Sequence, residues 1–446
     1  MTDIDDKEMY LNLRRKLKNK PSIFPNTSTE AAFSPHSQTI HLNKITPEQI
    51  RDGLKAGDLI QIRQPLQTIF HEMTHWADLI GTLWGREHLV RIYNAIYAAE
   101  LQSEGSESAY WMMLDLHDAD RRISYPKYYK MIAKDATGDP SSPWTIERTS
   151  GIEFNGTGFQ DPTWPIFFVK FGDRLTGRPV ARQPLSTSAL IETNAIWSEL
   201  ITGTEIVSGM DPHLAAVERR LWQDQLLRNA YHPELTEYSA PAHMLSVQTA
   251  SKDIMATYHA AALFNQIALN LPKELFEKIR HPESFEVFGD RNGHFRNRSN
   301  RGYVFAVLCY AAGPFPDSIS EMSDWLDAAL QQANLPRRDD IMDLAQQKLS
   351  HAGTMLIASD YSDAAAYLLE TGEKWFKQRV SWKDPGLPFG RIYESKLPVP
   401  LIFDENGSLF AISPNSIDKS RFDPIKLFDA EWMLLKRKEN FLSACR

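Results

Sequence analysis

The amino-acid sequence predicts an α+β protein in which helices dominate. Apolar residues recur at helical spacing through most of residues 213–375, whereas strand-like stretches are few and short. Those stretches are residues 39–43, two β-branched and aromatic segments between residues 143 and 172, and a final segment near residue 400. No internal repeat and no low-complexity tract interrupts this pattern.

The composition is that of a chain able to bury a large core. The 446 residues are 42% hydrophobic and 24% charged, and the formal net charge is −8. This acidic balance argues against general binding to nucleic acid or to anionic membranes, which requires a surplus of Lys and Arg. The longest apolar run, YVFAVLCYAAG, is too short to span a bilayer and indicates a buried helix, so we expect no transmembrane segment.

The cysteine content and the N-terminus favour a reducing compartment. Cys309 and Cys445 are the only cysteines, too few for a disulfide framework or a cysteine-based zinc site. The first twenty residues pass from acidic to basic without an apolar segment, so they match neither a signal peptide nor a transit peptide. We therefore expect a cytoplasmic protein, with secretion without a cleaved signal peptide left open.

The first elements follow from local residue types. The charged first twenty residues are a helix candidate, and a Pro-, Ser- and Thr-rich stretch follows them. In a strand over residues 39–43, Ile40 and Leu42 would both face inward. Pro65 suits the first turn of the next helix, because its missing N–H would have no partner there. That helix should end at Gly81.

The later elements are expected in this order. A second helix runs from about residue 87 to residue 100, and residues 144–154 and 165–172 form strands. The segment RQPLSTSALIETNAIWSEL opens with Ser and Thr, which are good N-caps, and continues as a helix. Gly-, Asn- and Arg-rich residues 288–303 interrupt the helical region as a loop. The Pro-rich tail should contain a hairpin that turns at Asn406-Gly407.

The stretch TIFHEMTHWAD, residues 68–78, places three polar groups among apolar neighbours. On a helix, residues four apart differ by about 40° of rotation and about 6 Å of rise, so His71 and His75 project from one face. Two such imidazoles can bind one metal ion. Glu72 is turned by about 100° from His71, within reach of a water on that ion, where it would act as a base.

This stretch resembles the signature of the zincin metallopeptidases. The resemblance covers about ten residues and includes the two histidines and the glutamate. It extends to the restricted positions around them, which here are Thr68, Ile69, Met73, Thr74, Trp76 and Ala77.

The resemblance implies a zincin-like core with a small sheet and an active-site helix. We place this catalytic region in residues 1–280, with the sheet and active-site helix in about residues 20–175 and a helical part in about residues 176–280. Residues 281–446 then form a mostly helical C-terminal region ending in a Pro-rich segment and a β-hairpin.

Two histidines do not complete a catalytic zinc site, which has three protein ligands and an open position for water. Six residues after His75, where the metzincin pattern has a third histidine, this chain has Gly81. The resemblance to gluzincins implies instead a Glu on a later helix, followed three residues on by a small residue. Glu192, followed by Ala195, has that form, so the implied Zn²⁺ ligands are His71, His75 and Glu192.

Other carboxylates compete for this role or support it. Glu199 lies seven residues after Glu192, so one of the two could bind the ion while the other orients a histidine. Asp78 lies seven residues after His71 and could also accept the ring N–H of a ligand histidine. The Asp that the fullest gluzincin patterns carry shortly after the ligand Glu is absent here. Rivals for the third ligand are Glu100, Glu104 and Glu107.

The resemblance implies peptide-bond hydrolysis in a protein or peptide, with Zn²⁺ activating a water and Glu72 acting as general base. Residues 39–43 precede the motif helix, as the edge strand that pairs with an extended substrate does in zincins. Zincins also use a Tyr or His from the later helices to stabilise the oxyanion. The candidates are Tyr238, His243, Tyr258 and His259. Each could instead be a structural aromatic residue or a hydrogen-bonded histidine.

Three alternatives remain open. A catalytically inactive zincin-like protein that binds a partner or senses a ligand would have the same pattern, although it would not need Glu72. A di-iron bundle requires a Glu-x-x-His pair from each of two helices, and Glu72 with His75 is the only pair. The two histidines could also be hydrogen-bonded on an amphipathic helix. The substrate and the oligomeric state are not readable from the sequence.

Overall fold

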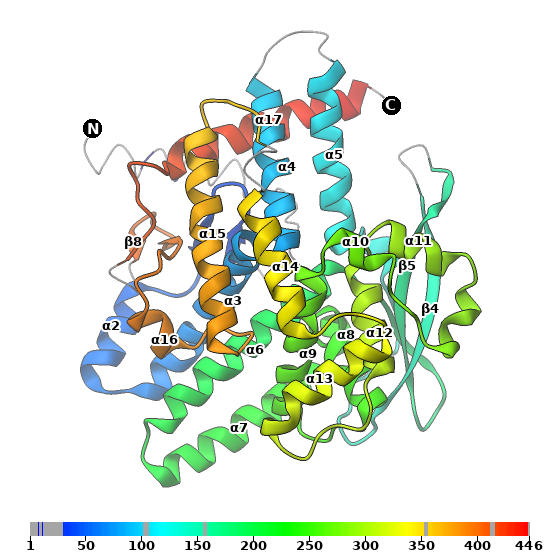
Figure 1. Cartoon of the computed structure of the whole chain (residues 1–446). Coiled ribbons are helices and arrows are strands. Elements are labelled where there is room, and N and C mark those ends of the chain that lie inside the picture. The colour runs from blue at the N-terminus through cyan, green and yellow to red at the C-terminus, as the bar shows by residue number, and fades with distance from the viewer. Residues whose placement is uncertain are drawn as a thin grey trace.

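The computed structural model describes residues 8, 11, 30–100, 107–154, 158–351, 356–410 and 415–444. Helices dominate these residues and two small sheets accompany them, which confirms the α+β prediction (Figure 1). The expected helix in the first twenty residues lies almost entirely outside the described residues. Among the described helices, none is long and apolar enough to cross a bilayer.

The first sheet joins the two ends of the described chain. Its strand order is β1-β2-β7-β8, with β2 antiparallel to β1 and parallel to β7. The strand expected at residues 39–43 is confirmed, and Ile40 and Leu42 are fully buried. The strands are β1 (Ala31–Ser34), β2 (Thr39–Leu42), β7 (Leu401–Phe403) and β8 (Leu409–Phe410).

The hairpin expected in the C-terminal tail is confirmed. Ile402 pairs with Phe410, and Phe403 pairs with Leu409. Between these strands Gly407 has φ +75°, a left-handed conformation that glycine adopts without strain.

The expectation that residues 39–43 form an edge strand is wrong. β2 has β1 on one side and β7 on the other, so both of its edges are used. The cause is the C-terminal hairpin, which adds β7 beside β2 from more than 350 residues away in the chain. Among the strands that the structure describes, β1 is the outermost on this side of the sheet.

The motif helix α3 (Leu59–Gly81) follows α2 (Pro47–Ala56) and ends where the sequence predicts. It begins earlier than expected, because the Asp58 carboxylate caps it by accepting the N–H of Gln61 at 3.0 Å. Pro65 therefore lies inside the helix and not in its first turn. Every residue from 69 to 81 is buried, so α3 is a central element of the core.

The second sheet is antiparallel, with the strand order β3-β6-β5-β4. The strands expected near residues 144–154 and 165–172 are confirmed as β4 and β5, whereas β3 and β6 were not predicted. Alternate residues of β5, Phe167 and Phe171 among them, enter the main core, while Phe168 faces the other side. The strands are β3 (Met131–Ile132), β4 (Trp144–Phe154), β5 (Gln160–Asp173) and β6 (Pro179–Pro184).

Helix α6 (Thr187–Ser208) starts directly after β6. The Ser186 hydroxyl accepts the N–H of Ala189 at 3.2 Å, which confirms the predicted cap and helix. The apolar run near residue 305 forms the buried helix α12 (Arg301–Ala311), also as predicted. Residues 288–303 are not all loop, because α11 (Arg291–Asn297) lies among them.

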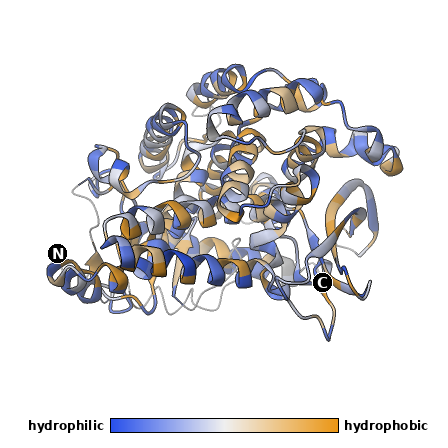
Figure 2. Ribbon diagram, turned by 90° about the horizontal axis from the view of Figure 1, so that it is seen from below, coloured by the Kyte–Doolittle hydropathy of each residue, from blue (hydrophilic) through white to orange (hydrophobic). Residues whose placement is uncertain are grey.

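The remaining helices surround α3, α6 and α12. In Figure 2 the outlying helices carry both hydrophilic and hydrophobic residues, as expected for helices with one buried face. They are α4 (Leu83–Glu100), α5 (Glu107–Ser124), α7 (Pro212–Ala230), α8 (Thr236–Thr249), α9 (Ile254–Asn270), α10 (Lys273–Phe276), α13 (Met322–Gln332), α14 (Arg338–His351), α15 (Ser362–Trp382), α16 (Phe389–Glu394) and α17 (Pro424–Ala444), with short 3-10 turns η1 (Lys127–Tyr129), η2 (Pro233–Leu235), η3 (Glu283–Phe288) and η4 (Ile319–Glu321).

Residues after 280 pack directly on the motif helix. α15 lies against α3, and a Cβ added to Gly372 would come within 1.9 Å of the Ile80 carbonyl oxygen (Figure 1). Glycine at this position therefore permits the close approach of the two helices. With β7 in the first sheet, these contacts cross the boundary expected at residue 280.

Candidate metal centre

The two histidines of the motif meet Glu192 where α3 packs against α6. His71 Nε2 lies 3.2 Å from Glu192 Oε2, and His75 Nε2 lies 3.5 Å from Glu192 Oε1. The exposed fractions of His71, His75 and Glu192 are 6%, 2% and 0%. The structure thus brings together, in a buried cluster, the three residues proposed from the sequence as metal ligands.

This cluster fits a divalent cation. Ligands about 2.0–2.2 Å from a tetrahedral Zn²⁺ lie about 3.3–3.6 Å apart, close to the two nitrogen–oxygen distances here. Within the described part of the chain, neither oxygen of the buried Glu192 carboxylate receives a well-directed hydrogen bond. Burying a carboxylate without hydrogen bonds costs free energy unless a cation or a donor compensates its charge. Two imidazoles and one carboxylate are also a donor set that Zn²⁺ uses.

Glu199 is the carboxylate that orients a histidine. Its Oε1 lies 2.6 Å from Nδ1 of His71, on the side of the ring opposite the nitrogen that faces Glu192. The Gln67 amide donates to the Glu199 backbone carbonyl at 3.0 Å and ties this part of α6 to α3. The arrangement leaves Nε2 of His71 directed into the cluster.

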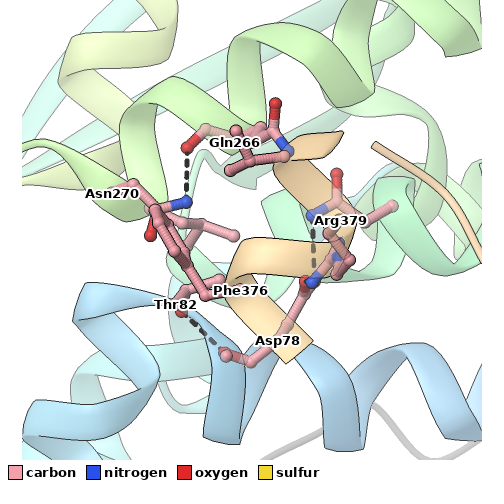
Figure 3. Close-up of a pocket in the computed structure, with 10 residues that line it drawn as sticks. Asp78, Thr82, Gln266, Asn270, Phe376 and Arg379 are labelled. Atoms are coloured by element: carbon pink, nitrogen blue, oxygen red, sulfur yellow. Dashed lines mark hydrogen bonds and ion pairs between the residues drawn. The ribbon is translucent and has the colours of Figure 1, made fainter. Parts of the chain in front are cut away.

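Asp78, the other candidate for this role, has different partners (Figure 3). Its Oδ1 lies 2.7 Å from Nη1 of Arg379, and its Oδ2 accepts the side-chain amide of Asn194 at 2.9 Å. Seven residues carry it about 10.5 Å along the helix axis from His71, beyond the reach of that imidazole. Asp78 instead joins three helices, α3, α6 and α15, one turn beyond the cluster.

The base candidate, Glu72, is 6% exposed and faces β1. Its carboxylate accepts the backbone N–H of Phe33, the third residue of that strand. Burial raises the pKa of Glu72 to about 7, against the opposing effect of the nearby His71. Burial likewise raises the pKa of Glu192 to about 7, and its contact with His71 opposes that rise.

The pKa values of the two imidazoles are shifted in opposite directions. Burial opposes the charged form of His71, but its contacts with Glu192 and Glu199 outweigh burial and raise its pKa well above the usual value. Burial lowers the pKa of His75 well below its usual value, and the charge on His71 adds to that effect. A metal ion would bind both imidazoles in their neutral forms, so its binding would compete with protonation of His71.

Of the four residues suggested as oxyanion donors, Tyr238 lies at the cluster. Its ring centroid is 6.3 Å from that of His71, and its side chain is partly buried on α8. The Tyr258 hydroxyl donates to the Tyr238 backbone carbonyl at 3.5 Å, so it supports that turn of α8. His243 donates to the Ala230 carbonyl at 2.8 Å, and His259 stacks on an indole ring of α6; both are packing residues.

The rival third ligands have other partners or positions. Glu100 hydrogen-bonds Tyr361, and Glu107 accepts the indole N–H of Trp111 at 3.2 Å. Glu104 lies outside the described residues. Across the part of the chain that the structure describes, His71, His75 and Glu192 are the one set of three such side chains close enough to hold an ion.

Sequence reasoning missed Phe33 and Arg379 as neighbours of the site. Phe33 contributes a backbone N–H, for which a side-chain motif carries no signal. Arg379 pairs with Asp78, which lies 301 residues away in the sequence, and no local sequence pattern predicts such a pairing.

The chain matches no protein family, no curated protein and no solved structure among those compared with it. The function is therefore inferred from the chemistry of the buried cluster itself.

Proposed function

We propose that this chain is a zinc-dependent metallopeptidase with a gluzincin-like zincin core, which hydrolyses peptide bonds in a protein or peptide substrate. The observation that carries the proposal is the convergence of His71, His75 and Glu192 in one buried cluster with Glu72 beside it. When bound there, Zn²⁺ lowers the pKa of a water molecule and polarises the substrate carbonyl.

In this proposal, four residues of the chain have catalytic or positioning roles. Glu72 takes a proton from the attacking water and hands it to the leaving amine. The Phe33 N–H holds the Glu72 carboxylate in position through a backbone hydrogen bond. Glu199 fixes the ring of His71 so that its Nε2 faces Glu192. Tyr238, close to His71, is placed to donate a hydrogen bond to the oxyanion.

The substrate backbone is proposed to lie along β1. Within the described residues this strand is the outermost strand of the first sheet, and it packs on α3. An extended peptide that pairs with a free strand edge gains backbone hydrogen bonds whatever its sequence. Because Phe33 of β1 contacts Glu72, a peptide on this edge passes close to the proposed base.

The test compares the purified full chain with Glu72→Gln. Zinc per chain is measured by mass spectrometry, and cleavage is followed over a diverse peptide library. Since Glu72 is not a ligand, both proteins should contain one zinc, while the variant should lose about 10²- to 10⁴-fold in rate. Glu48→Gln, at an exposed position in α2, is the matched control and should behave like the wild type.

Two outcomes contradict the proposal. Absence of zinc from a protein prepared with zinc present removes the metal centre. Full zinc occupancy without cleavage by the wild type over a broad library favours the alternative, a catalytically inactive zincin-like binding or sensor protein.

A further inference from the structure

A cavity of about 370 Å³ lies on the face of the β3-β6-β5-β4 sheet that carries Phe168. Its lining includes Tyr128 and Tyr129 of η1, Gly151 of β4, and Arg182 of β6. None of the residues around it belongs to the metal centre. We call this cavity the sheet pocket.

The floor of the sheet pocket is a guanidinium stacked on an aromatic ring. The central carbon of the Arg182 guanidinium lies 3.5 Å from the ring centroid of Phe168. A Cβ added to Gly151 would come 2.8 Å from the Phe168 ring and 3.1 Å from Nη2 of Arg182. The absence of a side chain at Gly151 therefore keeps this cation open on the side facing the cavity.

The pocket is positively charged although the whole chain is acidic. In the described residues, no carboxylate forms an ion pair with Arg182. Glu153, a buried acid of the same sheet, is already paired with Arg121 at 3.1 Å and Arg122 at 3.0 Å. The second lining arginine, Arg291, is held by the Ser150 hydroxyl at 2.6 Å through one of its nitrogens.

Aromatic side chains form a wall of the pocket. The rings of Tyr128 and Tyr129 lie 4.0 Å apart, and Tyr128 is 61% exposed at the mouth. The Tyr129 hydroxyl accepts the backbone N–H of Phe154 at 2.7 Å, which fixes its ring against the end of β4. A flat ligand can stack on such rings.

We propose that the sheet pocket binds a small molecule that carries an anionic group, a carboxylate or a phosphate, on an aromatic ring. Guanidinium groups bind both anions through paired N–H donors, and aromatic walls favour a planar body. The volume is within the range of small-ligand sites, about 300–1,000 Å³. This proposal is independent of the peptidase proposal, since the pocket shares no residue with the metal centre.

The test is isothermal titration calorimetry on the full chain with phenyl phosphate, benzoate, phenol and inorganic phosphate. At least one of the two aryl anions should bind at least about tenfold more tightly than phenol and inorganic phosphate, because it uses both the cation and the rings. The tighter of the two aryl anions identifies the preferred anionic group.

Two variants locate the binding. Arg182→Gln should weaken the aryl anion by about 10- to 100-fold, and Tyr128→Ala, at a mostly exposed position, should weaken it without risk to the fold. Arg178→Gln, an exposed arginine just before β6, is the matched control and should leave the affinity unchanged. Absence of binding by both aryl anions, or wild-type affinity in Arg182→Gln, overturns the proposal.

Discussion

Two carboxylates that each follow a proposed metal ligand by seven residues have different partners. Asp78 follows His71 by seven residues on one helix, and Glu199 follows Glu192 by seven on the other. Only Glu199 reaches an imidazole, because α3 and α6 pack side by side and bring Glu199 across to Nδ1 of His71. Spacing along one helix places a side chain on a face, but the partner helix decides what it contacts.

At the scale of single residues, Glu199→Gln should weaken zinc binding by about 10- to 100-fold. The neutral amide holds the His71 ring less firmly and makes the His71 imidazole less basic. Zinc affinity is measured by competition with a chromophoric chelator. Glu205→Gln, at an exposed position six residues later on α6, serves as the control. Equal affinity in Glu199→Gln and the wild type would remove Glu199 from the centre.

At the scale of elements, the candidate metal centre depends on how α3 packs against α6. The side-chain amide of Asn194 of α6 donates to the Asp78 carboxylate of α3. Arg379 of α15 pairs with the same carboxylate (Figure 3). Arg379 is 4% exposed and also donates to the Pro385 carbonyl at 2.7 Å. The C-terminal region thus contributes a buried cation to the interface that carries the ligands.

Arg379→Met should lower the free energy of unfolding by about 3–5 kcal/mol, because it leaves the Asp78 carboxylate buried without its cation. The double variant Asp78→Asn with Arg379→Met should recover part of this loss, since no buried charge is then uncompensated. Urea unfolding measures both.

Arg301→Met is the comparison for this pair, because the buried Arg301 donates to the carbonyls of Ala268 and Leu271 and, among the described residues, forms no ion pair with a carboxylate. Arg301→Met leaves no buried carboxylate without its cation. Adding Asp78→Asn to Arg301→Met should therefore recover none of the lost free energy of unfolding. Arg379→Met with wild-type stability would contradict a clamping role for α15.

Element boundaries show which physical signals the sequence carries. The start of α6 at the Ser186 cap and the end of α3 at Gly81 were both predicted, and at Ser186 the signal is local capping chemistry. The helix start expected at Pro65 was wrong, because Asp58, seven residues earlier, caps α3 by accepting the N–H of Gln61. The two-residue strand β3 and the seven-residue helix α11 are too short for periodicity to reveal them.

At the scale of the whole molecule, the fold joins segments distant in sequence. The parallel pairing of β2 with β7 and the packing of α15 on α3 depend on tertiary contacts, for which a single sequence carries no local signal. The cluster of proposed ligands was predictable because a five-residue motif gave His71 and His75, and the family resemblance implied Glu192. Neither the motif nor the family resemblance predicts that Arg379 pairs with Asp78, and neither predicts the sheet pocket.

The docking of α17 introduces a pH dependence of stability. Glu431 of α17 lies buried against the β1–β2 turn, where the Ser34 hydroxyl donates to it at 3.2 Å. Burial raises its pKa to about 8, and that hydrogen bond opposes the rise. The folded chain therefore holds a proton that the unfolded chain releases above about pH 4.5. This contribution to stability is full below that pH and is lost as the pH rises through 8.

Glu431→Gln keeps a neutral side chain at every pH. Between pH 6 and pH 9 its free energy of unfolding should fall less than that of the wild type, as measured by urea unfolding at both values. The exposed Glu439→Gln on the same helix should follow the wild type. Parallel pH profiles for Glu431→Gln and the wild type would show that Glu431 is ionised in the folded protein.

Anomalous X-ray diffraction at the zinc absorption edge, from crystals of the full chain grown with zinc, tests the metal centre most directly. We expect one strong peak per chain about 2.0–2.2 Å from Nε2 of His71, Nε2 of His75 and a carboxylate oxygen of Glu192. A zinc peak elsewhere with none between these side chains, or a Glu192 carboxylate more than about 10 Å from both rings, would contradict it.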